Sequence, residues 1–477
     1  MTVDSGAAAN RYRVPAVLVA TAVSLALGLF VEPWFGLVAA GLSAALILRP
    51  FEPISALAAL AAAASFVDNE GGRMARDLSV VTLVALYCMI PLALAWMKGR
   101  WRAPGGTMIA TLLAFLTWTA VTTLRGVLAG HSIKIISLEV AALGSMAFTF
   151  FASGLRITAR ELRPALVVLV VAALGHVALG IVSYVVNHIR TGGVWYTPLP
   201  GMVAVLALCF AVRARSLLAR MGWSLLLGLC LVHQTISFSR GYWLGLLVAL
   251  PWTAFAFAGI RAGALARWRR VAAVAGLAAL VLAAGTVVTA VALGWTDLPS
   301  LLGTRFGSSF ATQENTSVTA SNMERLLEYA ASFRLIREQP LIGHGMGLEL
   351  RIRDPFFHVV TRQAYVHQTY LWLWLKQGLV GLVLFLALLV QAIRTGLKGA
   401  RSDDPEQAAW CLGAAGATVY MSVVNLTTFH LAQVNATMLQ SLLWGFALAT
   451  TRPAHWRLVW RARSARPAGE RAGVHPA

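Results

Sequence analysis

The sequence predicts an all-α, polytopic integral membrane protein with 12 to 14 transmembrane helices and one long, partly helical extracytoplasmic loop. Three observations predict this class. The 477 residues are 58% hydrophobic and only 12% charged, whereas a soluble domain carries about 25% charged residues. Many apolar runs approach the roughly 20 residues that cross a bilayer. Clusters of Lys and Arg recur at every second connection between these runs. These features exclude an ordinary soluble enzyme and a disordered chain.

Fourteen apolar runs are candidate spans, and twelve is the alternative because the second and third runs are short. The first run begins at Val14 and is too long for the apolar core of a cleaved signal peptide, so we expect a retained membrane helix. The candidate runs are 14–31, 35–49, 53–67, 78–97, 106–127, 136–154, 164–187, 197–212, 222–239, 241–260, 271–294, 367–393, 407–426 and 433–451.

The basic clusters mark the cytoplasmic side of the membrane. With fourteen spans they hold 25 of the 39 basic residues on one side and place both termini in the cytoplasm. The formal net charge of +20 therefore reflects topology and anionic lipid, and it predicts no nucleic-acid partner. The chain divides into transmembrane helices (1–294), an extracytoplasmic loop region (295–366), transmembrane helices (367–451) and a basic cytoplasmic tail (452–477).

The loop of 72 residues over 295–366 is far longer than the other extracytoplasmic connections, which suggests a functional element. Ser321 and Glu324 have the spacing of a capping box, which predicts a helix start. Pro340 predicts its end. The stretch 303–320 is rich in Ser, Thr and Gly, and we expect it to be mobile. Apolar residues recur at helical spacing between these limits, which predicts an amphipathic helix; they are Met323, Leu326, Leu327, Ala330, Phe333 and Ile336.

His367 stands where this loop enters a membrane helix. It is either an interfacial histidine at a helix start or a general base at the membrane surface, since histidine titrates nearest to neutral pH. Lys376 follows nine residues later, about 14 Å along a straight helix. Either the helix rises above the bilayer and holds His367 over a cavity, or Lys376 is buried and paired. We expect the first arrangement, because the purely apolar part of the helix begins only at Leu379.

Arg240 lies in a connection of almost no length between two spans. It must therefore sit near the extracytoplasmic membrane surface, where a charge is costly without a partner or a cavity. Snorkelling to the lipid headgroups is one explanation. Its neighbours Ser237 and Ser239, with no acidic residue close in sequence, favour an anionic ligand such as a phosphate.

Arg325 falls in the first turn of the predicted loop helix, where a positive charge opposes the helix dipole. It therefore requires a ligand or a pair with Glu324 or Glu328. The Pro-x-x-Gly-x-Gly segment 340–345 is not a phosphate-binding loop, because no Lys-Ser/Thr follows. We expect a flexible turn, in which His344 has a structural role.

Other polar residues are weaker candidates. Four acidic residues could act as acid or base, but solvation or pairing with Arg73 and Lys134 is the preferred interpretation; they are Asp68, Glu70, Asp77 and Glu139. No extracytoplasmic loop contains an Asp-x-Asp pair, and we predict no metal site. The four cysteines lie inside apolar runs and are expected to be inert packing residues; they are Cys88, Cys209, Cys230 and Cys411.

Residues 222–395 resemble the bacterial O-antigen ligase and O-antigen polymerase superfamily. The resemblance consists of Ser-x-Ser-Arg-Gly between two spans, a long loop with an Arg at a helix start, a Pro-x-x-Gly-x-Gly turn, and a His opening a span that contains Gly378 and Gly381. The order and topological side of these motifs carry the resemblance. Gln368 departs from the family pattern, which typically has Asn after the His.

The resemblance implies a glycosyltransferase of the GT-C type that takes glycan from undecaprenyl diphosphate, needs no metal or other cofactor, and inverts the anomeric carbon. Arg240 and Arg325 would bind the donor diphosphate, and His367 would position or deprotonate the acceptor hydroxyl. Further supporting residues would be Ser239, Arg334, Arg337, Arg362, Gln368 and Tyr370.

The favoured function is an O-antigen ligase that uses the lipid A-core as acceptor on the periplasmic face of the bacterial inner membrane. An O-antigen or exopolysaccharide polymerase with the same donor is the alternative. A transporter is less favoured, because we find no internal repeat and the polar candidates gather at one membrane face. The expected partners are the lipid-linked glycan, the lipid A-core and membrane lipids.

Overall fold

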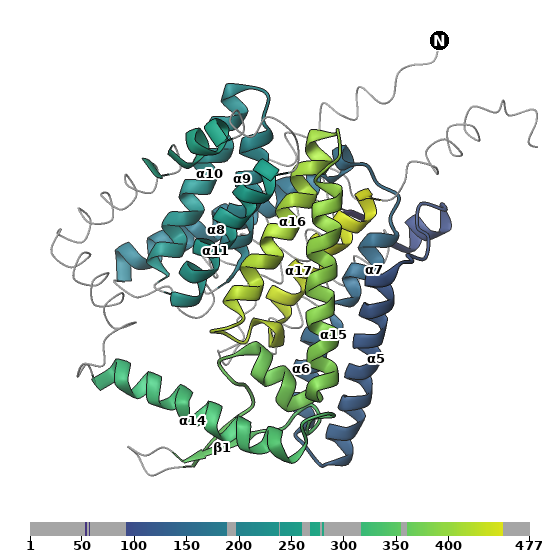
Figure 1. Cartoon of the computed structure of the whole chain (residues 1–477), viewed down its shortest axis with the longest axis vertical. Helices are drawn as coiled ribbons and strands as arrows, with labels where there is room; N and C mark the ends of the chain where they lie inside the picture. The colour runs from purple at the N-terminus through teal and green to yellow at the C-terminus, as the bar shows by residue number, and fades with distance from the viewer. Residues whose placement is uncertain are drawn as a thin grey trace, which may run out of the picture.

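The computed structural model describes residues 53–54, 57, 92–187, 197–237, 239–259, 268–276, 279–280, 316–353 and 360–451. Within these residues the chain is a bundle of helices with one short β-hairpin (Figure 1). The helices of the bundle are α5 (Thr107–Leu128), α6 (Ile133–Gly144), α7 (Ala147–Gly154), α8 (Arg163–Asn187), α9 (Leu199–Arg213), α10 (Leu217–Ile236), α11 (Arg240–Gly259), α15 (Thr369–Gly399), α16 (Pro405–Val424) and α17 (Val434–Thr451). The remaining elements are η1 (Ala159–Leu162), α14 (Thr316–Glu338), β1 (Leu350–Arg353), β2 (Val360–Gln363) and η3 (His430–Ala432).

The predicted class, an all-α polytopic membrane protein, is confirmed. Seven helices of the described residues are long and apolar enough to cross a membrane, and the 15-residue α9 is a shorter apolar helix. The candidate spans 14–31 and 35–49, most of 53–67 and 78–97, and most of 271–294 lie outside the described residues. The total of 12 to 14 spans therefore stays a prediction.

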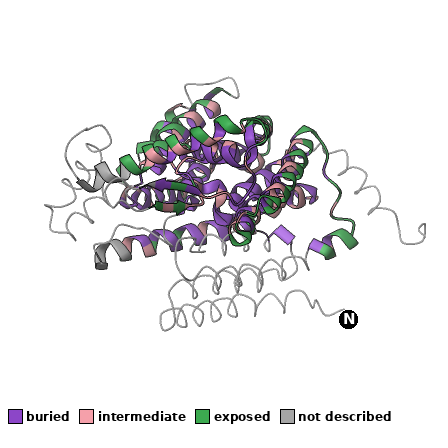
Figure 2. Ribbon diagram, turned by 90° about the horizontal axis from the view of Figure 1, so that it is seen from below, coloured by how far each residue is buried: buried purple, intermediate pink, exposed green. Residues whose placement is uncertain are grey.

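α9 forms the centre of one half of the bundle and packs against α8, α10, α11 and α16. It is buried along almost its whole length, so its apolar residues contact protein on all sides. Small residues allow close approach of such helices: a β-carbon on Gly245 would lie 2.6 Å from the Val424 side chain. The other half is built from α5, α6 and α15, with α17 packed between α7, α15 and α16. Buried residues fill the centre and exposed residues line the outside (Figure 2).

α14 lies across one end of the bundle and contacts α15 and β1 (Figure 1). It ends at Glu338, before Pro340, as predicted. The predicted helix start is wrong, because α14 already begins at Thr316 and the capping-box residues Ser321 and Glu324 lie inside it. Residues 316–320 are helical, and the rest of the stretch expected to be mobile lies outside the described residues. The sequence also gave no sign of the antiparallel hairpin β1–β2, which pairs Leu350 with Gln363.

α15 consists of two helical segments, because Gly378 has φ 70° and ψ −174° and breaks the helix. The segment from Leu379 to Gly399 has the length of a full membrane span, whereas the segment from Thr369 to Gln377 is a separate short helix before it. The predicted boundary at Leu379 therefore coincides with a real break in the backbone.

Residues 340–347 fill this break and are not a flexible turn. The carbonyls of Leu375 and Lys376, which lack helical partners, accept from the N–H groups of His344 and Gly345, both at 3.0 Å. On the other side of the break, the N–H of Leu379 donates to the carbonyl of Pro340 at 2.9 Å. The loop needs glycine, because residues 343, 345 and 347 all have positive φ. His344 donates from Nε2 to the main-chain carbonyl of Leu335 at 2.7 Å, which fits the structural role expected for it.

Lys376 is buried and paired, which is the second of the two arrangements considered and not the one expected. Its ammonium lies 2.7 Å from the Glu139 carboxylate, and both side chains are almost fully buried. It also donates to the carbonyl of Leu348. Glu139 accepts from the N–H of Gly347 at 2.6 Å. The ion pair thus joins α6, α15 and the end of the 340–347 loop, and Glu139 does not pair with Lys134.

Candidate active site

His367 lies directly before α15, whose first turn is capped by the neighbouring side chain. Gln368 is the N-cap residue and accepts from the N–H of Leu371 at 2.7 Å. The following residue, Thr369, is fully buried and donates its main-chain N–H to the carbonyls of Asn425 and Thr428, each at 3.0 Å. The backbone at His367 is therefore fixed against the connection between α16 and α17, and the imidazole has a defined position.

The imidazole of His367 contacts a buried carboxylate on α14. Nδ1 lies 2.9 Å and 3.0 Å from the two oxygens of Glu328, and the main-chain N–H of His367 donates to the same group at 3.1 Å. Glu328 is fully buried, whereas the His367 side chain keeps 27% of its surface exposed. Because an ionised carboxylate can only accept, Nδ1 donates in this contact, and in the neutral tautomer of the ring Nε2 is the nitrogen with a free lone pair.

Two aromatic rings surround this histidine. Phe429 and Tyr365 are stacked with ring centres 4.3 Å apart, and their centres lie 6.0 Å and 5.5 Å from that of His367. Both rings meet the imidazole edge to face. They exclude water from part of its surface, which strengthens electrostatic interactions at this position.

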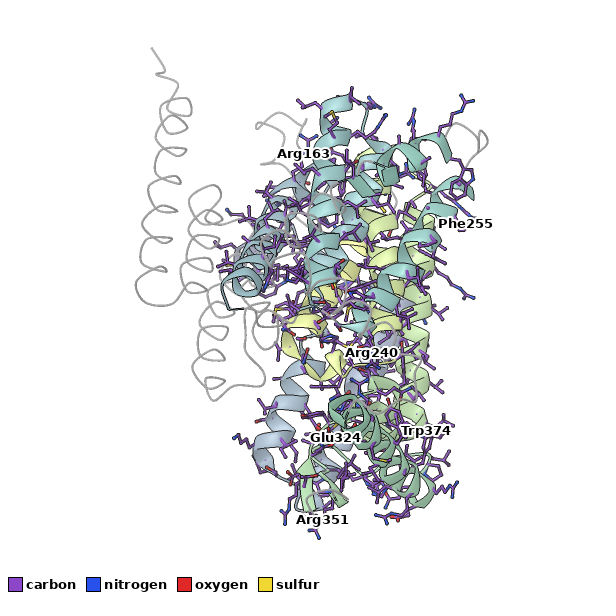
Figure 3. The ribbon with its side chains drawn as sticks, turned by 90° about the vertical axis from the view of Figure 1, so that its left-hand side faces the viewer. Arg163, Arg240, Phe255, Glu324, Arg351 and Trp374 are labelled. Atoms are coloured by element: carbon purple, nitrogen blue, oxygen red, sulfur yellow. The ribbon has the colours of Figure 1, made fainter. Side chains whose placement is uncertain are left out.

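Arg240 is the first residue of α11 and is half-buried. The turn before it is held by buried serines: the Ser237 hydroxyl donates to the carbonyl of Gln234 and accepts from the N–H of Ser239. The next residue, Gly241, packs against Thr427, in the same connection that holds Thr369. Arg240 and His367 therefore both adjoin residues 425–429. Figure 3 shows Arg240 well away from Arg163, on the side of the bundle toward Glu324 of α14.

Arg325 lies in the interior of α14, one turn before Glu328, and is half-buried. Residues three apart on a helix are neighbours, so Arg325 lies on the side of α14 that reaches His367. The two acids expected as its partners are engaged elsewhere: Glu328 binds His367, and Glu324 accepts from Gln363 at 2.8 Å. Burial raises the pKa of Tyr329 on the next turn, while Arg325 opposes that rise.

The supporting residues predicted from the sequence fall into two groups. Ser239 is buried beside Arg240, and Gln368 caps α15. Tyr370 donates its hydroxyl to the carbonyl of Ser422 at 2.7 Å, so it fastens α15 to α16. The three other predicted arginines are exposed and lie away from the contact between His367 and Glu328. Arg334 and Arg337 are on the outer side of α14, and Arg362 faces Arg351 across the hairpin.

Glu328 is the residue that sequence reasoning missed as part of the site. The apolar residues that defined the helix, such as Met323, Leu326 and Phe333, are exposed, whereas Glu328, Ser332 and Ile336 are buried at i, i+4 and i+8. A buried carboxylate needs a partner, but the apolar pattern indicated a different face of the helix, so no signal in the sequence marked Glu328 as buried. Asp68, Glu70 and Asp77 lie outside the described residues.

Residues 225–386 match the family model described as O-antigen ligase. This segment, about a third of the chain, is similar to the O-antigen ligase family. The match begins in α10 and ends in α15, so it includes Arg240, Arg325, Glu328 and His367, and it confirms the resemblance found in the motifs. A search of curated proteins finds no match to the chain. The match supports an O-antigen ligase or polymerase type of function and implies a glycosyltransferase-like membrane enzyme.

Among the described residues, no three side chains of His, Cys, Asp or Glu come together in the manner of a metal site. Cys209, Cys230 and Cys411 are buried thiols in apolar surroundings. The roles of the site residues and the absence of a metal requirement stay predictions, and they are developed as a proposal below.

Proposed function

We propose that this protein transfers glycan from undecaprenyl diphosphate to a sugar hydroxyl of the lipid A-core, at the periplasmic face of the bacterial inner membrane. The observation that carries the proposal is the contact of the partly exposed His367 with the fully buried Glu328. A neutral imidazole held by a carboxylate at Nδ1 suits a general base, because the carboxylate stabilises the imidazolium that forms on Nε2.

In the proposed reaction, Nε2 of His367 takes the proton of the acceptor hydroxyl while its oxygen attacks the anomeric carbon. The bond from that carbon to the diphosphate oxygen breaks, and undecaprenyl diphosphate leaves with the electron pair. Attack from the side opposite the leaving group inverts the anomeric carbon. Glu328 keeps Nδ1 protonated throughout, so the proton moves only at Nε2.

Arg240 and Arg325 would stabilise the charge that develops on the diphosphate. Arginine provides a planar donor pair that fits phosphate oxygens. Arg240 also begins α11, and the positive end of a helix dipole favours an anion at that place. Fixed cationic groups of this kind can do the charge stabilisation that Mg²⁺ supplies in other phosphate chemistry. The proposal therefore requires neither a metal nor a nucleotide.

A polymerase that adds one lipid-linked glycan to another is the second candidate, since the domain family supports both. Reconstitution of the purified protein with undecaprenyl-diphosphate glycan separates them. Offering lipid A-core gives a product of one added glycan for a ligase, and offering only donor gives a ladder of products for a polymerase. Transfer that persists in EDTA is expected from the proposed chemistry, and loss of transfer in EDTA would contradict it.

His367→Ala tests the central residue in the same assay. We expect transfer to fall about 10²- to 10⁴-fold, the usual contribution of a general base. Arg334→Ala is the matched control, because this arginine is exposed on the outer side of α14, and it should keep normal transfer. Normal ligation by His367→Ala, with an unchanged melting temperature, would exclude the general-base role.

A further inference from the structure

Tyr365 and Phe429 form an aromatic stack beside the candidate base His367. Their ring centres are 4.3 Å apart and their planes are inclined by 16°. Both ring planes are steep to the imidazole, at 79° and 90°. Tyr365 precedes His367 by two residues, whereas Phe429 comes from the connection between α16 and α17. Two segments that are far apart in the sequence thus place aromatic rings at one histidine.

His367 lies at the side of this stack and does not cover its outer face. The imidazole centre is 5.5 Å from the centre of Tyr365 and 6.0 Å from that of Phe429. A ring packed on the outer face of Tyr365 would be much farther from Phe429 than from Tyr365, because the two stacked rings are themselves 4.3 Å apart. Phe429 covers the inner face of Tyr365, so a ligand meets Tyr365 from the opposite face, with His367 at its side.

The main chain on both sides of Phe429 is fixed. Before it, the carbonyl of Thr428 accepts from the N–H of Thr369 at 3.0 Å. After it, the buried His430 stacks on the buried Tyr242, with ring centres 5.5 Å apart and planes inclined by only 10°. Phe429 is therefore a firm support for the other ring of the stack.

The stack reaches the surface although both of its members are large aromatic residues. Tyr365 is 38% exposed and Phe429 is partly exposed, whereas Val366, the next residue along the chain, is buried. Exposing aromatic surface to water costs free energy. A rigid aromatic side chain, in turn, offers a large contact area with little loss of conformational entropy on binding. An exposed, supported ring beside a candidate base is therefore suited to contact a substrate.

A sugar ring has the chemistry that fits this surface. One face of a pyranose presents C–H groups, whose small positive charges are attracted to the negative face of an aromatic ring. The hydroxyls at the rim of the sugar remain available, so a sugar stacked on Tyr365 can present one of them to Nε2 of His367. The donor diphosphate is assigned to Arg240 and Arg325, which leaves the stack for the other substrate.

We propose that the stack of Tyr365 and Phe429 binds the acceptor sugar, the ring whose hydroxyl attacks the anomeric carbon of the donor. Tyr365 contacts the C–H face of this pyranose, and Phe429 supports Tyr365 from behind. One hydroxyl of the sugar then lies at Nε2 of His367. This inference rests on the proposed glycan transfer and adds the part of the site that selects the acceptor.

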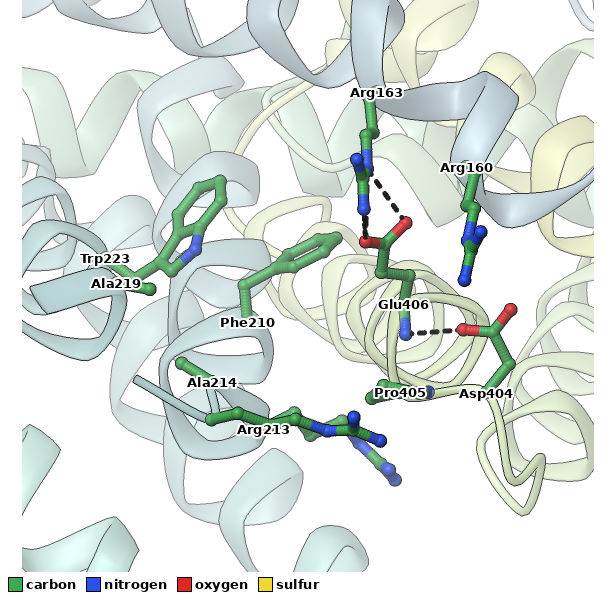
Figure 4. A pocket seen from close by; sticks show the side chains of 11 residues that line it. Arg160, Arg163, Phe210, Arg213, Ala214, Ala219, Trp223, Asp404, Pro405 and Glu406 are labelled. Atoms are coloured by element: carbon green, nitrogen blue, oxygen red, sulfur yellow. Dashed lines mark hydrogen bonds and ion pairs between the residues drawn. The ribbon is translucent and has the colours of Figure 1, made fainter. Parts of the chain in front are cut away.

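A second aromatic stack provides a matched control. Phe210 and Trp223 have ring centres 4.9 Å apart and planes inclined by 25°, and both residues are partly exposed. They line a cavity in which Arg163 donates to Glu406 (Figure 4). Arg163 lies well away from Arg240 in Figure 3. Trp223→Leu therefore removes a comparable stacked ring at a distance from the candidate active site.

Kinetics of the full chain in proteoliposomes, with undecaprenyl-diphosphate glycan and lipid A-core, test the proposal. Tyr365→Leu should raise the KM for lipid A-core about fivefold, equivalent to an aromatic contact of about 1 kcal/mol. Its KM for the donor should stay the same. Tyr365→Phe keeps the aromatic ring and should restore the acceptor KM to within about twofold of the wild type. Trp223→Leu should match the wild type, and melting temperatures show that all variants are folded.

A lower kcat with an unchanged acceptor KM in Tyr365→Leu would overturn the proposal, because the ring would then only shield His367 from water. A rise in the donor KM alone, or an equal change in Trp223→Leu, would overturn it as well. If the wild type transfers no glycan to lipid A-core, the proposed function fails. Saturation-transfer NMR with the core oligosaccharide then tests the stack by itself: the wild type should contact the C–H protons of the sugar, Tyr365→Leu should not, and absence of contact in the wild type would refute the inference.

Discussion

Two glutamates at the same end of this bundle are buried to similar degrees and serve different purposes. Glu328 and Glu139 each accept from a main-chain N–H group, those of His367 and Gly347 respectively. Each also meets one basic side chain. The partner of Glu139 is Lys376, of which 1% is exposed, and the partner of Glu328 is His367, of which 27% is exposed.

The difference teaches how to separate a structural ion pair from a site. A buried pair that no substrate can reach can only hold elements together, and the Lys376 pair joins α6, α15 and the 340–347 loop. A buried carboxylate whose partner reaches the surface can change the chemistry of that partner. Exposure of the basic partner, more than the strength of the contact, therefore marks the candidate active site.

The largest effect is expected from breaking the buried ion pair of Lys376 and Glu139. Lys376→Met leaves the Glu139 carboxylate buried without its cation, which should cost about 3–5 kcal/mol of stability. Thermal unfolding in detergent measures the loss. Lys134→Met is the matched control, since Lys134 is exposed on the same helix as Glu139, and it should unfold as the wild type does. Replacing both members of the pair by Met should recover much of the loss, and failure to do so would mean that the pair has a role besides mutual neutralisation.

The second prediction concerns the pair of His367 and Glu328, of which His367 reaches the surface. Glu328→Gln removes the charge that stabilises the imidazolium and should lower kcat of glycan transfer on the order of 10²-fold. The KM for the acceptor should stay the same, which a purely structural defect would not produce. Glu324→Gln, one turn earlier on α14 and exposed, is the control and should leave kcat unchanged. An equal loss in both variants would assign the effect to α14 as a whole.

From the sequence, His367 was predicted as a site residue but its partner Glu328 was not, and the pair of Lys376 with Glu139 was not predicted. The reasons concern distance along the chain. His367 and Arg240 were predicted because hydropathy and charge are local signals that place a residue at the end of a span. Glu328 lies 39 residues from His367, and only the docking of α14 on α15 brings them together. Lys376 was misplaced because a straight helix was assumed, whereas Gly378 breaks it. The 340–347 loop was expected to be a flexible turn. It is fixed instead, because its backbone forms hydrogen bonds with the helix ends at this break.

The third prediction asks whether Arg325, one turn before Glu328 on α14, also takes part in glycan transfer. Arg325→Ala should weaken transfer about tenfold or more, because a phosphate contact with an arginine is a charge-assisted hydrogen bond. Arg337→Ala, at an exposed position of the same helix, should change transfer less than about twofold. Initial rates over a range of donor concentrations measure both. Equal effects of the two substitutions would mean that Arg325 acts only through the positive charge of α14, and that it does not contact the substrate.

The smallest effect is expected at Gln368, which adjoins His367 but touches neither glutamate. Its side chain caps α15, so Gln368→Ala should cost about 1 kcal/mol of stability. Gln368→Asn introduces the residue that the superfamily pattern has here, and asparagine is a better N-cap, so stability and transfer should both be retained. Melting temperature and transfer rate distinguish the two roles. If Gln368→Asn changes the rate while the melting temperature holds, the amide acts on the substrate, and the site extends beyond the histidine and its carboxylate.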